Sequence, residues 1–186
     1  PAFAACKVSR PVALVSGHPD KAKKVAAAYG LDPKNIYDYE TYDKLADNPP
    51  LMIIAHGGNG PGLAEQEMVR RMNARGVATL LFDAFEMNGF RYHGTSLFLT
   101  GATNESRQRM IFKATLGAYH WARQHPRIDG SRLFIHGLSN GGSVALNMAA
   151  VVDPAHVRLV IAEGAPSAGI GMPDQVRVPL LVVFGK

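Results

Sequence analysis

The sequence contains a single cysteine, Cys6, among its 186 residues. One thiol cannot form a disulfide within the chain, so the fold depends on core packing, and the cysteine count does not distinguish a reducing from an oxidising compartment. The chain also lacks the run of about twenty apolar residues that a transmembrane helix needs. Its N-terminus lacks the basic-then-apolar pattern of a secretory signal peptide. We therefore expect no membrane partner and a cytoplasmic location by default, with an exported form as the alternative because the sequence starts at Pro1 rather than at Met.

The sequence also lacks the patterns that are typical of a nucleic-acid binding site and of a metal site. Twenty lysine and arginine residues outnumber 15 aspartate and glutamate residues, which gives a formal net charge of +5. These basic residues are dispersed over expected helix surfaces and form no stripe that alternates with aromatic residues, so we expect no nucleic-acid partner. No group of histidine, cysteine and aspartate has the spacing of metal ligands. We expect neither a metal nor another cofactor.

What the sequence does contain is a series of short apolar, β-branched runs, most of them separated by segments with helical periodicity. This alternation predicts an α/β fold, in which a parallel sheet is covered by helices on both faces. The expected strands are Val12–Val15, Leu51–Ala55, Val77–Phe82, Leu133–His136, Val157–Ala162 and Leu180–Phe184.

The fourth apolar run leads into the motif on which the functional prediction depends. Leu133–His136 is followed by Gly137-Leu138-Ser139-Asn140-Gly141 and then, without a spacer, by a helix-forming segment. Gly-x-Ser-x-Gly between a strand and a helix is typical of a nucleophile elbow, in which a strained turn presents the serine hydroxyl above the sheet edge. The alternative is a glycine-rich loop with an incidental serine. The strand before and the helix after favour Ser139 as a catalytic nucleophile.

A second glycine-rich turn follows the run Leu51–Ala55. His56-Gly57-Gly58 supplies free backbone N–H groups that can hold an oxyanion, which is the other requirement of an acyl-transfer serine. We therefore predict that the N–H of Asn140 and that of Gly58 or Asn59 stabilise a tetrahedral intermediate. The predicted catalytic set is Ser139, Asn140 and Gly58, and the predicted partner is a small-molecule ester or lactone.

From Leu51 to its end the chain resembles α/β-hydrolases of the dienelactone hydrolase type and the related prolyl-oligopeptidase-like esterases. The resemblance implies strands three to seven of the hydrolase sheet, with Ser139 after strand five. It also implies a triad acid and a histidine beyond Lys186, so we expect the hydrolase core to be incomplete at the C-terminus. Whether this chain is active is therefore left open. Glu163 is an internal candidate for the acid. The pieces that match are His56-Gly57-Gly58, Leu80-Leu81-Phe82-Asp83, Gly137-Leu138-Ser139-Asn140-Gly141-Gly142, Ile161-Ala162-Glu163-Gly164 and Val178-Pro179-Leu180-Leu181-Val182-Val183-Phe184-Gly185.

The first fifty residues differ from the rest, and Pro49-Pro50 marks a boundary because two prolines interrupt any regular element. Residues 3–48 are similar to a Rossmann-like βα fragment of the NADP-binding domain in the glucose–fructose oxidoreductase family, through Val12-Ala13-Leu14-Val15-Ser16-Gly17, Lys21-Ala22-Lys23, Ala27-Ala28-Tyr29-Gly30 and Ile36-Tyr37-Asp38-Tyr39. The resemblance implies that Ser16, Gly17 and Lys21 hold the NADP 2′-phosphate. The glycine-rich turn that binds the pyrophosphate is not in this chain, so we expect no tight nucleotide site.

The sequence therefore predicts a fusion of two parts, residues 1–50 and a hydrolase core at 51–186, that form one compact unit. In this unit Val12–Val15 stands in for the early strands of the hydrolase sheet. The leading function is a serine hydrolase of carboxylic esters or lactones. One alternative is a non-catalytic α/β scaffold or chimeric fragment that forms an oligomer through an exposed sheet edge after Leu180–Phe184. The other is an NADP-binding oxidoreductase remnant.

Overall fold

The structure is a computed structural model that describes residues 13–41, 48–90, 92–93, 96–97 and 102–184. It divides into two compact units, Pro1–Asp47 and Asn48–Lys186, and each is described by itself. Cys6 lies outside the described residues.

The described part of the first unit contains an α-helix, a short 3-10 helix and a small sheet. Strand β1 (Leu14–Val15) pairs in parallel with β2 (Ile36–Tyr37). Helix α1 (Pro19–Tyr29) and the short 3-10 helix η2 (Pro33–Asn35) lie between them in sequence, and Gly30 ends α1 in the left-handed conformation at φ 66°. The expectation that Val12–Val15 joins the hydrolase sheet is wrong, because β1 and β2 form a separate two-stranded sheet.

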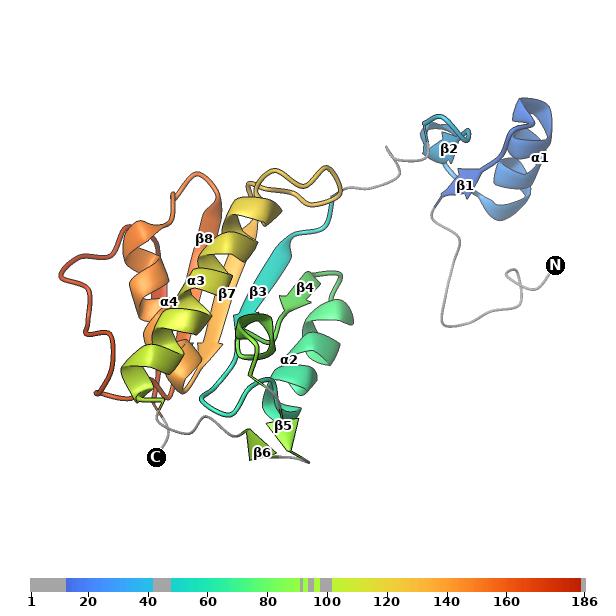
Figure 1. Cartoon of the computed structure of the whole chain (residues 1–186). Helices are drawn as coiled ribbons and strands as arrows, with labels where there is room; N and C mark the ends of the chain where they lie inside the picture. The colour runs from blue at the N-terminus through green and yellow to red at the C-terminus, as the bar shows by residue number, and fades with distance from the viewer. Residues whose placement is uncertain (1–12, 42–47, 91, 94–95, 98–101, 185–186) are drawn as a thin grey trace. The chain divides into compact units, whose positions relative to one another are not determined.

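The second unit is built on a five-stranded parallel sheet with the order β4-β3-β7-β8-β9 (Figure 1). The predicted apolar runs form these strands, and the chief difference is that β7 extends two residues beyond His136 into the serine motif. Their bounds are β3 Leu51–Ala55, β4 Ala78–Leu81, β7 Leu133–Leu138, β8 Val157–Glu163 and β9 Leu180–Val183.

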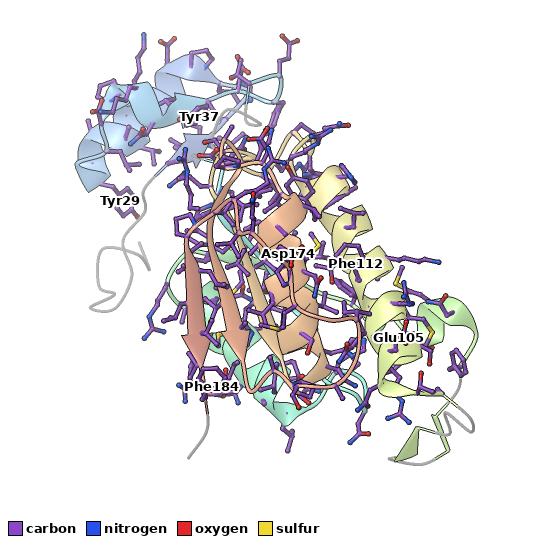
Figure 2. All side chains as sticks on the ribbon, turned by 90° about the vertical axis from the view of Figure 1, so that its left-hand side faces the viewer. Tyr29, Tyr37, Glu105, Phe112, Asp174 and Phe184 are labelled. Atoms are coloured by element: carbon purple, nitrogen blue, oxygen red, sulfur yellow. The ribbon has the colours of Figure 1, made fainter. Side chains whose placement is uncertain are left out.

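Three helices flank the sheet, as the alternating pattern predicts. They are α2 (Leu63–Asn73), α3 (Asn104–Ala122) and α4 (Asn140–Val151). Helix α2 packs against β4 at one end of the sheet, whereas α3 and α4 contact each other and the central strands. Figure 2 shows α3 and α4 on the same side of the strands, with Phe112 marking α3. A short 3-10 helix, η4 (Glu86–Asn88), and an antiparallel pair, β5 (Tyr92–His93) and β6 (Ser96–Leu97), precede α3 and were not anticipated.

The hydrophobic core lies between this helix pair and the sheet. Alternate residues of the central strands, such as Ile53 and Ile135, are fully buried there against Ile111 of α3 and Met148 of α4. Strand β9 forms one edge of the sheet, and its Leu181 and Val183 are partly exposed. No helix in the described part of the chain is long and apolar enough to span a bilayer. Because the strands are parallel, the turns that follow β3, β7 and β8 meet at one edge of the sheet.

Candidate active site

Ser139 lies on the turn between β7 and α4 in a conformation that residues with side chains rarely adopt. Its φ is 56° and its ψ is −118°, and among the described residues it is the only non-glycine with a positive φ. Such a conformation costs of order 1–3 kcal/mol and is found chiefly at functional sites. The residue is nevertheless exposed to solvent. The turn therefore presents the serine at the sheet edge rather than in the interior.

The glycines around Ser139 allow backbones to approach closely. A Cβ atom at Gly137 would lie 1.9 Å from the carbonyl oxygen of Gly141, and one at Gly141 would lie 2.1 Å from that of Ala55. A side chain at either position would force β3, β7 and α4 apart. The backbone N–H of Ser139 also donates to the Glu163 carbonyl at 2.8 Å, which ties the turn to the end of β8.

The loop after β3 is held by the buried imidazole of His56. Its Nε2 accepts a hydrogen bond from the backbone N–H of Ala84 at 3.0 Å, so the ring proton is on Nδ1, which donates to the Gly57 carbonyl at 2.7 Å. Burial lowers the pKa of His56 below its ordinary value of 6.5 because the charged ring is poorly solvated there. The neutral ring thus fastens the start of the loop to the chain that follows β4.

Glu65, in the first turn of α2, holds the same loop from the other side. Its side chain is 4% exposed, and its two oxygens accept hydrogen bonds from the N–H groups of Gly57 at 3.0 Å and Gly62 at 2.9 Å. The loop also closes on itself through a bond from the Gly60 N–H to the Gly57 carbonyl. Since Glu65 occupies the Gly57 N–H, that group is not available to a substrate.

The two glycine-rich turns lie against each other. A Cβ atom at Gly57 would be 3.6 Å from the Cβ of Ser139, and one at Gly58 would be 2.7 Å from the side-chain nitrogen of Asn140. Within the described residues the N–H of Gly58 has no hydrogen-bond acceptor, and the N–H of Asn140 belongs to the first helical turn, where N–H groups have no intrahelical partner. The structure therefore brings the predicted residues Ser139, Asn140 and Gly58 to one place.

The proposed internal acid, Glu163, pairs with a histidine. His136 Nε2 lies 3.1 Å from Glu163 Oε2, and His136 is 3% exposed within β7, in register with Ile54 and Ile161. Across the described part of the chain no side chain is hydrogen-bonded to the Ser139 hydroxyl. A base for Ser139 is therefore not identified among these residues.

Sequence reasoning missed the residues that hold the loop after β3. Glu65 stands three residues after Gly62, the spacing of a capping box, and that signal could have identified it. The role of His56 depends on Ala84, which is 28 residues away in sequence, and no local pattern indicates it.

In the first unit, the predicted phosphate ligands Ser16, Gly17 and Lys21 lie at or just before the start of α1. The Ser16 hydroxyl accepts from the His18 N–H at 3.1 Å, and Gly17 packs against the Tyr39 ring. The described residues contain no group of three or more His, Cys, Asp or Glu side chains placed to hold a metal ion. The expectation that this unit has no tight nucleotide site stays a prediction.

Comparison with known proteins identifies the fold. No family model matches the chain. Among solved structures, a dienelactone hydrolase from Anabaena variabilis has 21% identity and a TM-score of 0.56, covering 74% of this chain and 62% of its own. A Klebsiella pneumoniae structure assigned to the dienelactone hydrolases has 19% identity and a TM-score of 0.54, covering 74% and 61%. The two comparisons agree that the fold of this chain is that of the α/β-hydrolases. The chain spans about six tenths of the length of these structures.

Proposed function

We propose that this α/β-hydrolase fold carries a serine hydrolase site for small carboxylic esters or lactones. Ser139 is the nucleophile, and the backbone N–H groups of Asn140 and Gly58 form the oxyanion hole. The observation that carries the proposal is the positive φ of an exposed serine between β7 and α4, directly beside the Gly57-Gly58 turn.

The proposed reaction is acyl transfer. The Ser139 hydroxyl oxygen attacks the ester carbonyl carbon, the carbonyl oxygen becomes an oxyanion, and the alcohol leaves when the tetrahedral intermediate collapses to an acyl-enzyme. Loss of one oxyanion donor typically costs about 100- to 1,000-fold in rate. A base must take the Ser139 proton and return it to the oxygen of the leaving alcohol. No base is hydrogen-bonded to Ser139 among the described residues, and Glu163 is the internal candidate for the triad acid.

A fluorophosphonate probe tests the nucleophile directly because it phosphonylates an activated serine. We expect one label per chain in the folded protein, no label in Ser139→Ala and unchanged labelling in Ser143→Ala. Ser143 is a matched control, since it lies one turn further along α4 and its hydroxyl bonds to the Pro166 carbonyl. Mass spectrometry of the labelled peptide locates the modified residue. Folded protein that takes no label would contradict the proposal and favour the non-catalytic scaffold.

A further inference from the structure

Gln108, in α3, is a fully buried polar residue that the proposed reaction does not use. Its carboxamide makes three hydrogen bonds. Nε2 donates to the side-chain oxygen of Asn140 and to the Ala168 carbonyl, both at 3.1 Å, and Oε1 accepts from the backbone N–H of Ile170 at 2.8 Å. One side chain therefore links α3 to the residue after the nucleophile and to the loop that follows β8.

These bonds fix the direction of the Gln108 amide. A backbone N–H can only donate and a backbone carbonyl can only accept, so Ile170 and Ala168 determine which end of the amide is oxygen and which is nitrogen. Gln108 must then present an N–H to Asn140, which presents its oxygen in return. The Asn140 nitrogen is left on the side of Gly58, 2.7 Å from the position that a Gly58 Cβ would occupy.

The loop after β8 rests directly on this amide. A Cβ atom at Gly169 would lie 1.8 Å from Gln108 Oε1, and the φ of Gly169 is +138°. Both the space and the backbone conformation require glycine at this position. The backbone at Gly169 therefore packs closely against the Gln108 amide, whose direction is set by its hydrogen bonds to Ile170, Ala168 and Asn140.

We propose that Gln108 is a positioning residue of the oxyanion site. It holds the Asn140 carboxamide against the Gly58 turn and so sets the separation between the Gly58 and Asn140 N–H groups. The inference rests on the proposed function of Ser139. Its physical basis is that a misplacement of about 1 Å by a residue remote from the reacting atoms can cost about 100-fold in rate.

The first test measures the rate of fluorophosphonate labelling in Gln108→Met, a variant of similar shape without hydrogen-bonding groups. We expect a drop of about 10- to 100-fold, with the fold checked by circular dichroism. The matched control is Asn147→Asp, because Asn147 binds the same loop through the Gly171 carbonyl at 3.0 Å but has no bond to Asn140. The control is expected to stay within about threefold.

A double-mutant cycle separates positioning from general loosening of the fold. Asn140→Ala removes the carboxamide and keeps the backbone N–H, so it should reproduce the loss seen in Gln108→Met. The double variant should be no slower than the slower single variant, because both changes break the same link. Multiplying effects, or an equal loss in Asn147→Asp, would overturn the proposal.

A second readout does not depend on labelling. In ¹⁵N-resolved NMR spectra, Gln108→Met should shift the Gly58 backbone resonance, and so should Asn140→Ala, while Asn147→Asp should not. If the wild type takes no label, the proposed function fails. The changes in the Gly58 resonance still show whether Gln108 positions the Gly58 turn. A Gly58 resonance that does not move in either variant would overturn the inference, and Asn140→Ala decides the point if Gln108→Met does not fold.

Discussion

At the scale of single residues, the backbone of Ser139 stores strain that a glycine would not have. Ser139→Gly should raise the free energy of unfolding by about 1 kcal/mol, because glycine adopts a positive φ without steric cost and gives back only part of that gain as unfolded-chain entropy. Urea unfolding followed by circular dichroism measures the change. Ser139→Ala keeps the Cβ atom and should give no gain, and an equal gain in both variants would show that the hydroxyl, not the backbone, is the source.

His56 makes stability depend on pH. Burial lowers the pKa of His56 in the folded protein. As the pH falls below the ordinary pKa of histidine, the unfolded chain therefore binds more protons than the folded protein does. Protonation also removes the acceptor for the Ala84 N–H. The contribution is fully present above about pH 6.5 and is lost as the pH falls below it.

We therefore expect the free energy of unfolding to fall more steeply between about pH 7 and 5 in the wild type than in His56→Gln. Urea midpoints at both pH values provide the comparison. His120→Gln, an exposed histidine on α3, is the control and should keep the wild-type slope. Parallel slopes for the wild type and His56→Gln would contradict the expectation.

At the scale of elements, Glu65 connects α2 to the loop that follows β3. Glu65→Ala leaves the N–H groups of Gly57 and Gly62 without their acceptor, and we expect a loss of about 2–3 kcal/mol in the free energy of unfolding. The control is Glu67→Gln on the same helix, whose ion pairs with Arg70 and Arg71 are on the surface, where solvent screening makes such pairs contribute little. Equal losses in the two variants would mean that Glu65 acts only as a helix residue.

Apolar patterns in the sequence predicted where the strands lie better than they predicted which strands pair with one another. Leu51–Ala55 is β3 to the residue because all five of its side chains are buried, which is what a continuous apolar run indicates. The apolar run that contains Leu14 and Val15 correctly predicted a strand, but the prediction that this strand joins the larger sheet was wrong. Apolar character selects a buried strand and carries no information on which neighbour supplies its hydrogen bonds.

For the site, local spacing was informative and long-range contacts were not. Gly137-Leu138-Ser139-Asn140-Gly141 predicts a turn because the two glycines that permit it stand within two residues of the serine. The bond from Gln108 to Asn140 joins residues that are 32 positions apart. A glutamine on a helix is ordinarily a surface residue, so its burial could only be seen once α3 and α4 were packed together.

At the scale of the whole molecule, each unit has its own elements. Among the described residues, every member of the main hydrophobic core comes from Leu51 or later. We expect a chain of residues 48–186 to melt within about 2 °C of the full chain, because units with separate cores unfold independently. Thermal circular dichroism tests this, and a midpoint lowered by more than about 5 °C would show that residues 1–47 stabilise the second unit.

The contact between Gly169 and Gln108 constrains the order in which such a chain can evolve. Any larger residue at 169 collides with the amide, whereas loss of the amide first strands the loop's polar groups. The positive φ of Gly169 favours glycine with or without the glutamine, so we expect a descendant that loses Gln108 to keep Gly169 and to leave the Ala168 carbonyl and the Ile170 N–H without their partners.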